Sequence, residues 1–156
     1  MRRNRLWALL LATFALGGCR SAEITDMYIS LDKAGVRRTS CVNPDVPSYN
    51  AIIELLSHRE DTIVWPFFYN DANGEEITLD WKDGELEEFG NIAAGKGEAF
   101  IVLSLERNVD QDPKDPPFPT GLFRMDVYLN DESAPRDSLR WSIDTKCDLR
   151  PIPDTI

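Results

Sequence analysis

The chain has 156 residues and carries 17 Lys and Arg against 27 Asp and Glu, a formal net charge of −10. This length suits one domain with a sizeable hydrophobic core. Because so many carboxylates repel a phosphate backbone, the composition argues against nucleic acid as a partner.

The first 18 residues have the parts of a secretory signal. Three arginines within the first five residues give a basic start, an apolar run spans residues 6–16, and two glycines precede Cys19. The run has 11 residues, whereas a helix needs about 20 residues to cross a bilayer. The segment therefore predicts a cleaved export signal rather than a permanent span or a buried cytosolic helix. Cleavage removes three arginines and no acid, so the mature chain carries a net charge of −13.

The sequence Leu16-Gly17-Gly18-Cys19 resembles the bacterial lipobox, in which a Leu stands three residues before a Cys with small residues between them. The resemblance implies that Cys19 carries fatty-acyl chains such as palmitate, that residues 1–18 are removed, and that residues 19–22 form a lipidated tether. Two or more acyl chains hold a protein stably on a membrane. Arg20 stands where an Asp often retains such lipoproteins at the inner membrane, so the resemblance favours the outer membrane, on its periplasmic or surface face.

Export also bears on the other two cysteines. With Cys19 assigned to lipid, Cys41 and Cys147 remain as an even pair. A disulfide between them is the default in an oxidising envelope. The chain-entropy model gives up to about 4.7 kcal/mol for closing a loop of about 100 residues. A metal-binding pair and two free thiols are the alternatives.

The mature chain predicts about seven strands and no amphipathic helix. Period-two alternation, or runs of β-branched and aromatic residues, cover residues 23–31, 51–56, 63–69, 77–81, 99–105, 121–129 and 139–144. Asp32-Lys33-Ala34-Gly35 marks a turn, Asn73-Gly74 predicts a hairpin, and Pro66 is expected at a sheet edge or bulge because it has no N–H. This spacing indicates an all-β sandwich or barrel.

These strands resemble the immunoglobulin-like sandwich modules of exported bacterial proteins. The segment 118–129 is similar to their penultimate-strand signature, a Pro-x-Gly turn before an alternating strand, and Trp65 stands about where such folds place a core Trp. Phe123 replaces the usual corner Tyr, and Met125 replaces the second Cys of antibody domains. The resemblance implies a single immunoglobulin-like β-sandwich over residues 23–150, followed by a tail at residues 151–156.

No pattern predicts an enzyme. His58 is the single histidine and stands in a polar turn, and the chain has no Gly-x-Ser-x-Gly elbow. One His and two paired cysteines do not make an ordinary zinc site. Paired acids are frequent in the sequence, and solvated loop acids are favoured over two carboxylates held across a cleft, as a glycosidase needs. The sequence therefore predicts no catalytic residue, no metal and no cofactor.

The candidate binding loop is the Asp- and Pro-rich stretch of residues 108–120, which includes Phe118. Asp110, Asp112 and Asp115 supply oxygen atoms of the kind that Ca²⁺ prefers, but the stretch lacks the glycine and terminal Glu of an EF-hand loop, and Lys114 interrupts it. A flexible loop is therefore favoured over a calcium site. An exposed aromatic at position 118 would mark a binding surface, and a buried one would cap the core.

Together these patterns predict a lipid-anchored module that binds another envelope protein through this loop or an open sheet edge. The alternatives are a structural accessory lipoprotein of a larger secretion or surface complex, and an envelope hydrolase.

Overall fold

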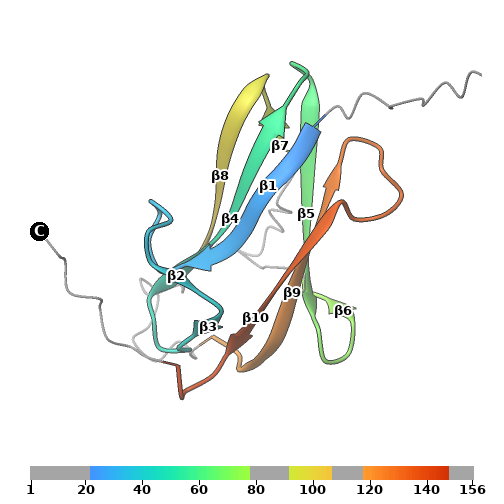
Figure 1. Cartoon of the computed structure of the whole chain (residues 1–156). Helices are drawn as coiled ribbons and strands as arrows, with labels where there is room; N and C mark the ends of the chain where they lie inside the picture. The colour runs from blue at the N-terminus through green and yellow to red at the C-terminus, as the bar shows by residue number, and fades with distance from the viewer. Residues whose placement is uncertain (1–21, 78–91, 107–117, 148–156) are drawn as a thin grey trace, which may run out of the picture.

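A computed structural model describes residues 22–77, 92–106 and 118–147, which form two β-sheets packed face to face (Figure 1). The strands are β1 (Ala22–Ser30), β2 (Arg38–Thr39), β3 (Cys41–Val42), β4 (Ser48–Ser57), β5 (Thr62–Asn70), β6 (Glu75–Glu76), β7 (Ile92–Ala94), β8 (Gly97–Glu106), β9 (Gly121–Leu129) and β10 (Asp137–Ile143). Within these three ranges, no helix is long and apolar enough to cross a membrane.

The strand order is that of an immunoglobulin-like sandwich. One sheet has the order β2-β1-β4-β8, and the other has the order β3-β10-β9-β5-β6, with β7 also paired to β5. If β1, β4, β5, β8, β9 and β10 are lettered A, B, C, E, F and G, the sheets contain A-B-E and G-F-C, as in immunoglobulin domains. The short β3 adds to the second sheet by pairing parallel to β10. The predicted all-β, immunoglobulin-like sandwich is confirmed.

Six of the seven predicted strands are confirmed as β1, β4, β5, β8, β9 and β10. In the seventh, predicted at residues 77–81, Ile77 lies just after β6 and donates its N–H to the Phe68 carbonyl at 2.8 Å. Positions 78–81 lie outside the described residues. The other strands hold two or three residues each, which is too short for a period-two pattern to predict.

Several predictions fall on other parts of the chain. The lipidation site Cys19, the acids Asp110, Asp112 and Asp115, and the tail at residues 151–156 all lie outside the described residues. The strand β1 begins at Ala22, the last residue of the predicted tether, and the Ala22 side chain is fully buried.

Pro66 occupies an edge position, as predicted. It lies in β5 opposite Val127 of β9. The Phe68 carbonyl, two residues further on, accepts its hydrogen bond from Ile77 on the side away from β9. Backbone groups alternate sides along a strand, so the N–H that Pro66 lacks would also point away from β9. No described strand pairs with Pro66 on that side.

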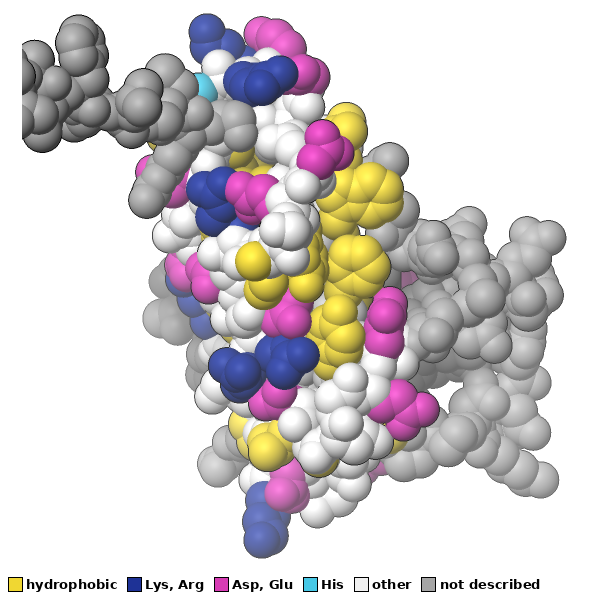
Figure 2. All heavy atoms as spheres, turned by 90° about the vertical axis from the view of Figure 1, so that its right-hand side faces the viewer, with side chains coloured by type: hydrophobic (Ala, Val, Ile, Leu, Met, Phe, Trp, Pro, Cys, Tyr) yellow, Lys and Arg dark blue, Asp and Glu magenta, His cyan; other side chains and the backbone are white. Residues whose placement is uncertain are grey.

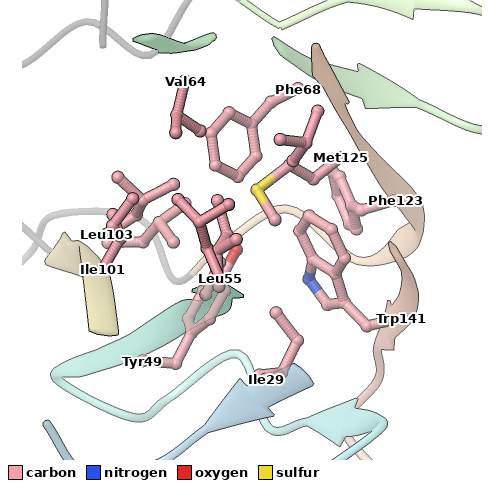
Figure 3. Packing of buried hydrophobic residues seen from close by; sticks show 14 of the residues in the cluster. Ile29, Tyr49, Leu55, Val64, Phe68, Ile101, Leu103, Phe123, Met125 and Trp141 are labelled. Carbon is pink, nitrogen blue, oxygen red and sulfur yellow. The ribbon is translucent and has the colours of Figure 1, made fainter. Parts of the chain in front are cut away.

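The core between the sheets is built around an aromatic cluster (Figure 3). The Trp141 ring of β10 stacks on Phe123 at 5.8 Å between centroids and meets Phe68 edge to face at 6.1 Å. Met125, which has no exposed surface, packs beside these rings. The prediction of Trp65 as the core tryptophan is wrong, because Val64 and Phe68 of β5 face inward and Trp65, at an odd position between them, faces outward.

The predicted disulfide between Cys41 and Cys147 is confirmed, and their Cα atoms are 5.6 Å apart. It links the short β3 to the chain just after β10. The two strands are also joined by backbone hydrogen bonds, in which Ser142 N–H donates to Ser40 O and Asp144 N–H donates to Val42 O, both at 3.0 Å. The early chain is therefore fixed to the last strand by one covalent and several polar contacts.

The predicted turn at residues 32–35 covers part of the outer face of the four-stranded sheet. The Asp32 carboxylate accepts the N–H groups of Val36 at 3.1 Å and Arg37 at 2.6 Å, which closes the turn. Gly35 lies so close to the sheet that an added Cβ would be 2.5 Å from the Tyr28 hydroxyl. Ile52, which projects from the outer face of β4, is consequently fully buried.

Candidate functional site

The outer face of the six-stranded sheet carries aromatic side chains from two neighbouring strands. In β5, every second residue from Thr62 to Phe68 is buried, so the residues between them point outward. Tyr128 of β9 stands opposite the first outward aromatic residue of β5. We call these partly exposed residues the aromatic face: Trp65, Phe67, Tyr69 and Tyr128. Figure 2 shows hydrophobic side chains in a column down this side of the molecule, with acidic side chains beside them.

The aromatic face forms the floor of a shallow pocket of about 340 Å³. The Phe67 and Tyr128 rings meet edge to face, with centroids 5.5 Å apart and planes at 87°. The four aromatic residues are joined in the lining by Glu76, Asn130 and Glu132. The pocket is therefore apolar at its floor and polar at its rim.

The polar residues stand at opposite ends of the pocket. Glu76 is opposite Tyr69 in the pairing of β6 with β5, so it marks one end. Asn130 follows β9 and marks the other end of the pocket. Its N–H donates to Ile63 O at 2.8 Å, and its Oδ1 accepts the Ile63 N–H at 3.0 Å. These bonds hold Asn130 at a φ of 53°, a left-handed conformation that Asn tolerates. Glu132 lies two residues further on and is paired with Arg136.

The cations beside the pocket are already neutralised. Arg124 contacts Asp71 at 2.9 Å and Asp126 at 3.0 Å, and Arg140 contacts the second oxygen of Asp71 at 2.9 Å. The Arg124 guanidinium also lies 4.8 Å from the centre of the Tyr69 ring. This network fixes the Tyr69 end of the aromatic face and leaves no unpaired positive charge on the pocket lining that the structure describes.

The surroundings of the pocket raise the pKa of the Tyr69 hydroxyl. Burial raises the pKa of Tyr69 above its ordinary value of 10.0, and nearby Tyr128 and Glu76 raise it further, while Arg124 opposes them. At neutral pH this side chain is therefore a neutral phenol that can donate a hydrogen bond. The Glu76 carboxylate is exposed and has no ion-pair partner among the described residues.

Phe118, the candidate residue of the predicted binding loop that the structure describes, packs on the end of the core. It is partly buried, its ring meets Tyr49 edge to face at 5.0 Å, and its N–H donates to Pro44 O at 3.1 Å. His58 is exposed in the turn between β4 and β5. No three His, Cys, Asp or Glu side chains in the described ranges are grouped closely enough to hold a metal ion.

The aromatic face is not among the sites predicted from the sequence. Its signal is present in residues 63–69, which are apolar at both odd and even positions. A strand of this kind is either buried on both faces or exposes an aromatic surface. The periodicity alone does not separate these cases.

No family model and no curated protein sequence matches the chain. Solved structures with a similar arrangement of strands include a Pseudomonas fluorescens alkylpurine DNA glycosylase, AlkC, bound to DNA containing an abasic site analog (13% identity, TM-score 0.45, covering 79% of this chain and 30% of that chain). A second is the C-terminal domain of Wzt (15% identity, TM-score 0.41, covering 79% of this chain and 71% of that chain). A third is the CARDB domain of a Pyrococcus furiosus protein in complex with di-metal ions (14% identity, TM-score 0.35, covering 78% of this chain and 93% of that chain). At these values the similarities carry no argument about function. The strand order defines the chain as an immunoglobulin-like β-sandwich module.

Proposed function

We propose that this protein is a lipid-anchored recognition module of the bacterial cell envelope, and that it binds another envelope protein through the aromatic face. The observation that carries the proposal is the row of partly exposed Trp, Phe and Tyr side chains around a pocket on the outer face of the six-stranded sheet. Tyr and Trp are enriched among residues that dominate binding energy, and a polar, solvent-accessible rim typically surrounds them.

The lipobox-like sequence that ends at Cys19 supports the membrane anchor. Only Arg20 and Ser21 separate Cys19 from the start of β1 in the sequence, so an anchor at Cys19 could be at most about 10 Å from the sandwich. Ala22 pairs with Ser57 at the end of β4, and its carbonyl accepts a hydrogen bond from Arg136 of the β9–β10 connection at 3.5 Å. This end of the sandwich would therefore face the membrane.

With this orientation the long strands run away from the membrane and the aromatic face looks sideways. The Asn130 and Glu132 end of the pocket would then be nearest the membrane and the Glu76 end farthest from it, so a neighbouring envelope protein would approach the face from the side. The residue after Cys19 is Arg20 rather than the Asp that often retains bacterial lipoproteins at the inner membrane, and this supports the outer membrane as the location.

The proposal is tested by crosslinking the full chain in its native envelope, purifying it and identifying neighbours by mass spectrometry. Phe67→Ala removes an aromatic ring from the aromatic face, and Phe100→Ala is the matched control on the opposite sheet, where Phe100 is 49% exposed. A central interface aromatic is often worth 2 kcal/mol or more, so Phe67→Ala should lower recovery of the partner about tenfold or more.

The control variant should recover the partner as well as the wild-type chain does. Circular dichroism and thermal unfolding of both variants establish that they fold. Equal recovery by wild type and a folded Phe67→Ala variant, or no specific neighbour under several growth conditions, would contradict the proposal.

A further inference from the structure

The pocket on the aromatic face combines two features that attract a positive charge. Its floor is made of aromatic rings, whose faces carry the negative part of a quadrupole. Glu76, which has no ion-pair partner among the described residues, stands at one end, and Glu132, whose charge is partly balanced by Arg136, stands at the other. Cations bind to the faces of Trp, Tyr and Phe within about 6 Å of the ring centre, and nearby carboxylates add ordinary Coulomb attraction.

The protein itself places a cation on one of these rings. The Arg124 guanidinium lies 4.8 Å from the Tyr69 ring centre at the edge of the pocket. Asp71 and Asp126 hold that guanidinium in place, so it occupies one end of the aromatic face and does not cover the rest. The Trp65, Phe67 and Tyr128 rings have no cation of this kind among the described residues.

The charge of the whole molecule favours the same kind of ligand. The chain has a net charge of −10, which becomes −13 without residues 1–18. Such a field speeds the approach of a basic partner and repels an acidic one. Near the pocket, Glu75 and Asp131 are exposed and extend the negative rim at its two ends.

We infer that the pocket accepts a lysine or arginine side chain from a basic segment of the partner protein. This inference rests on the proposed function and names the chemistry that its binding surface recognises. The rings at 87° to each other form a corner that can surround a cation from two sides. Sugar rings stack best on broad, coplanar aromatic surfaces, so a glycan is the alternative that the test must separate.

The experiment uses the purified lipidated protein in nanodiscs of neutral phosphatidylcholine. The probe is an end-capped hexapeptide of alternating Lys and Ala, and binding is followed by isothermal titration calorimetry. Matched peptides with Gln or Glu in place of Lys, and a neutral glucose hexasaccharide, are the comparison ligands. The lysine peptide is expected to bind, its affinity should fall as salt is raised because the charges are solvent-accessible, and the comparison ligands should not bind.

Variants of the protein locate the binding site. Phe67→Ala should weaken the affinity for the lysine peptide about tenfold, and Glu76→Gln should weaken it about two- to fivefold. The control is Glu98→Gln, which removes the same charge from an exposed position on β8 in the other sheet. It should bind within about twofold of wild type, because a distant charge is screened at physiological salt.

The inference is overturned if the lysine peptide does not bind, if Glu76→Gln and Glu98→Gln weaken binding equally, or if the hexasaccharide binds in its place. Quenching of Trp65 fluorescence by an aqueous quencher shows whether the pocket is open to solvent. If Trp65 is shielded and no peptide binds, the chain covers its own pocket, and the inference is also overturned. If a partner still crosslinks through the aromatic face, only the cationic ligand is wrong. If the peptide binds but no envelope neighbour is recovered, the proposed function fails instead.

Discussion

Gly35 controls how closely the first connection of the chain packs on the four-stranded sheet. Its φ of 75° is in the left-handed region, which favours glycine, and an added Cβ would be 2.5 Å from the Tyr28 hydroxyl and 3.2 Å from the side chains of Ile52 and Phe100. The Tyr28 hydroxyl cannot easily move away, because it donates a 2.7 Å hydrogen bond to Glu54. Backbone conformation and space therefore both require glycine at this position.

Gly35→Ala should lower the free energy of unfolding by about 2–4 kcal/mol, the sum of left-handed strain and overpacking. Gly74 supplies a matched control, since it has a φ of 71° and no atom within 4 Å of an added Cβ. Gly74→Ala should cost only about 1–2 kcal/mol, from the backbone strain alone. Chemical denaturation of the two variants measures the difference, and equal losses would show that the close approach at Gly35 contributes nothing.

At the same scale, the outward residues of β5 show why the candidate site was not predicted. The sequence Val64-Trp65-Pro66-Phe67-Phe68 offers apolar side chains to both faces. The choice of the inner face depends on the register with β9, where Trp65 pairs with Tyr128 and Phe68 pairs with the buried Met125. That register is a contact between distant parts of the chain, and no local pattern encodes it.

At the scale of elements, the long strands were predictable and the short ones were not. β9 alternates cleanly in its sequence because its two faces meet different environments, and the same pattern marks β10. β3 has two residues and exists because it pairs parallel to β10 and is tied to it by the disulfide. The cysteine count predicted the disulfide bond, although nothing in the residues around Cys41 predicted the strand.

Replacing both cysteines, as Cys41→Ala with Cys147→Ala, should lower the free energy of unfolding by about 2–5 kcal/mol. The bond closes a loop between positions 106 residues apart, so its loss frees much of the unfolded chain. Thermal unfolding with and without a reductant provides the measurement. The reductant should destabilise the wild-type chain and leave the double variant unchanged, whereas a wild-type chain insensitive to reductant would contradict the role given to the disulfide.

At the scale of the whole molecule, the two sheets differ in what covers them. The turn at residues 32–35 packs over the outer face of the four-stranded sheet and buries Ile52. The six-stranded sheet instead carries the aromatic face and its pocket on the outside. The pocket therefore lies on the side of the sandwich that we propose for recognition, and the proposed anchor at Cys19 would hold that side facing neighbours in the envelope.

Contact between the aromatic face and a partner protein can be detected with a photo-crosslinking amino acid. The residue is introduced at position 67 on β5 or at position 100 on β8 of the full chain, in living cells, so that the two sheets are compared at two phenylalanine positions. The proposed contact predicts that illumination joins one specific envelope protein to position 67 and leaves position 100 without a specific product. Crosslinking from position 100 alone, or from neither position, would contradict it.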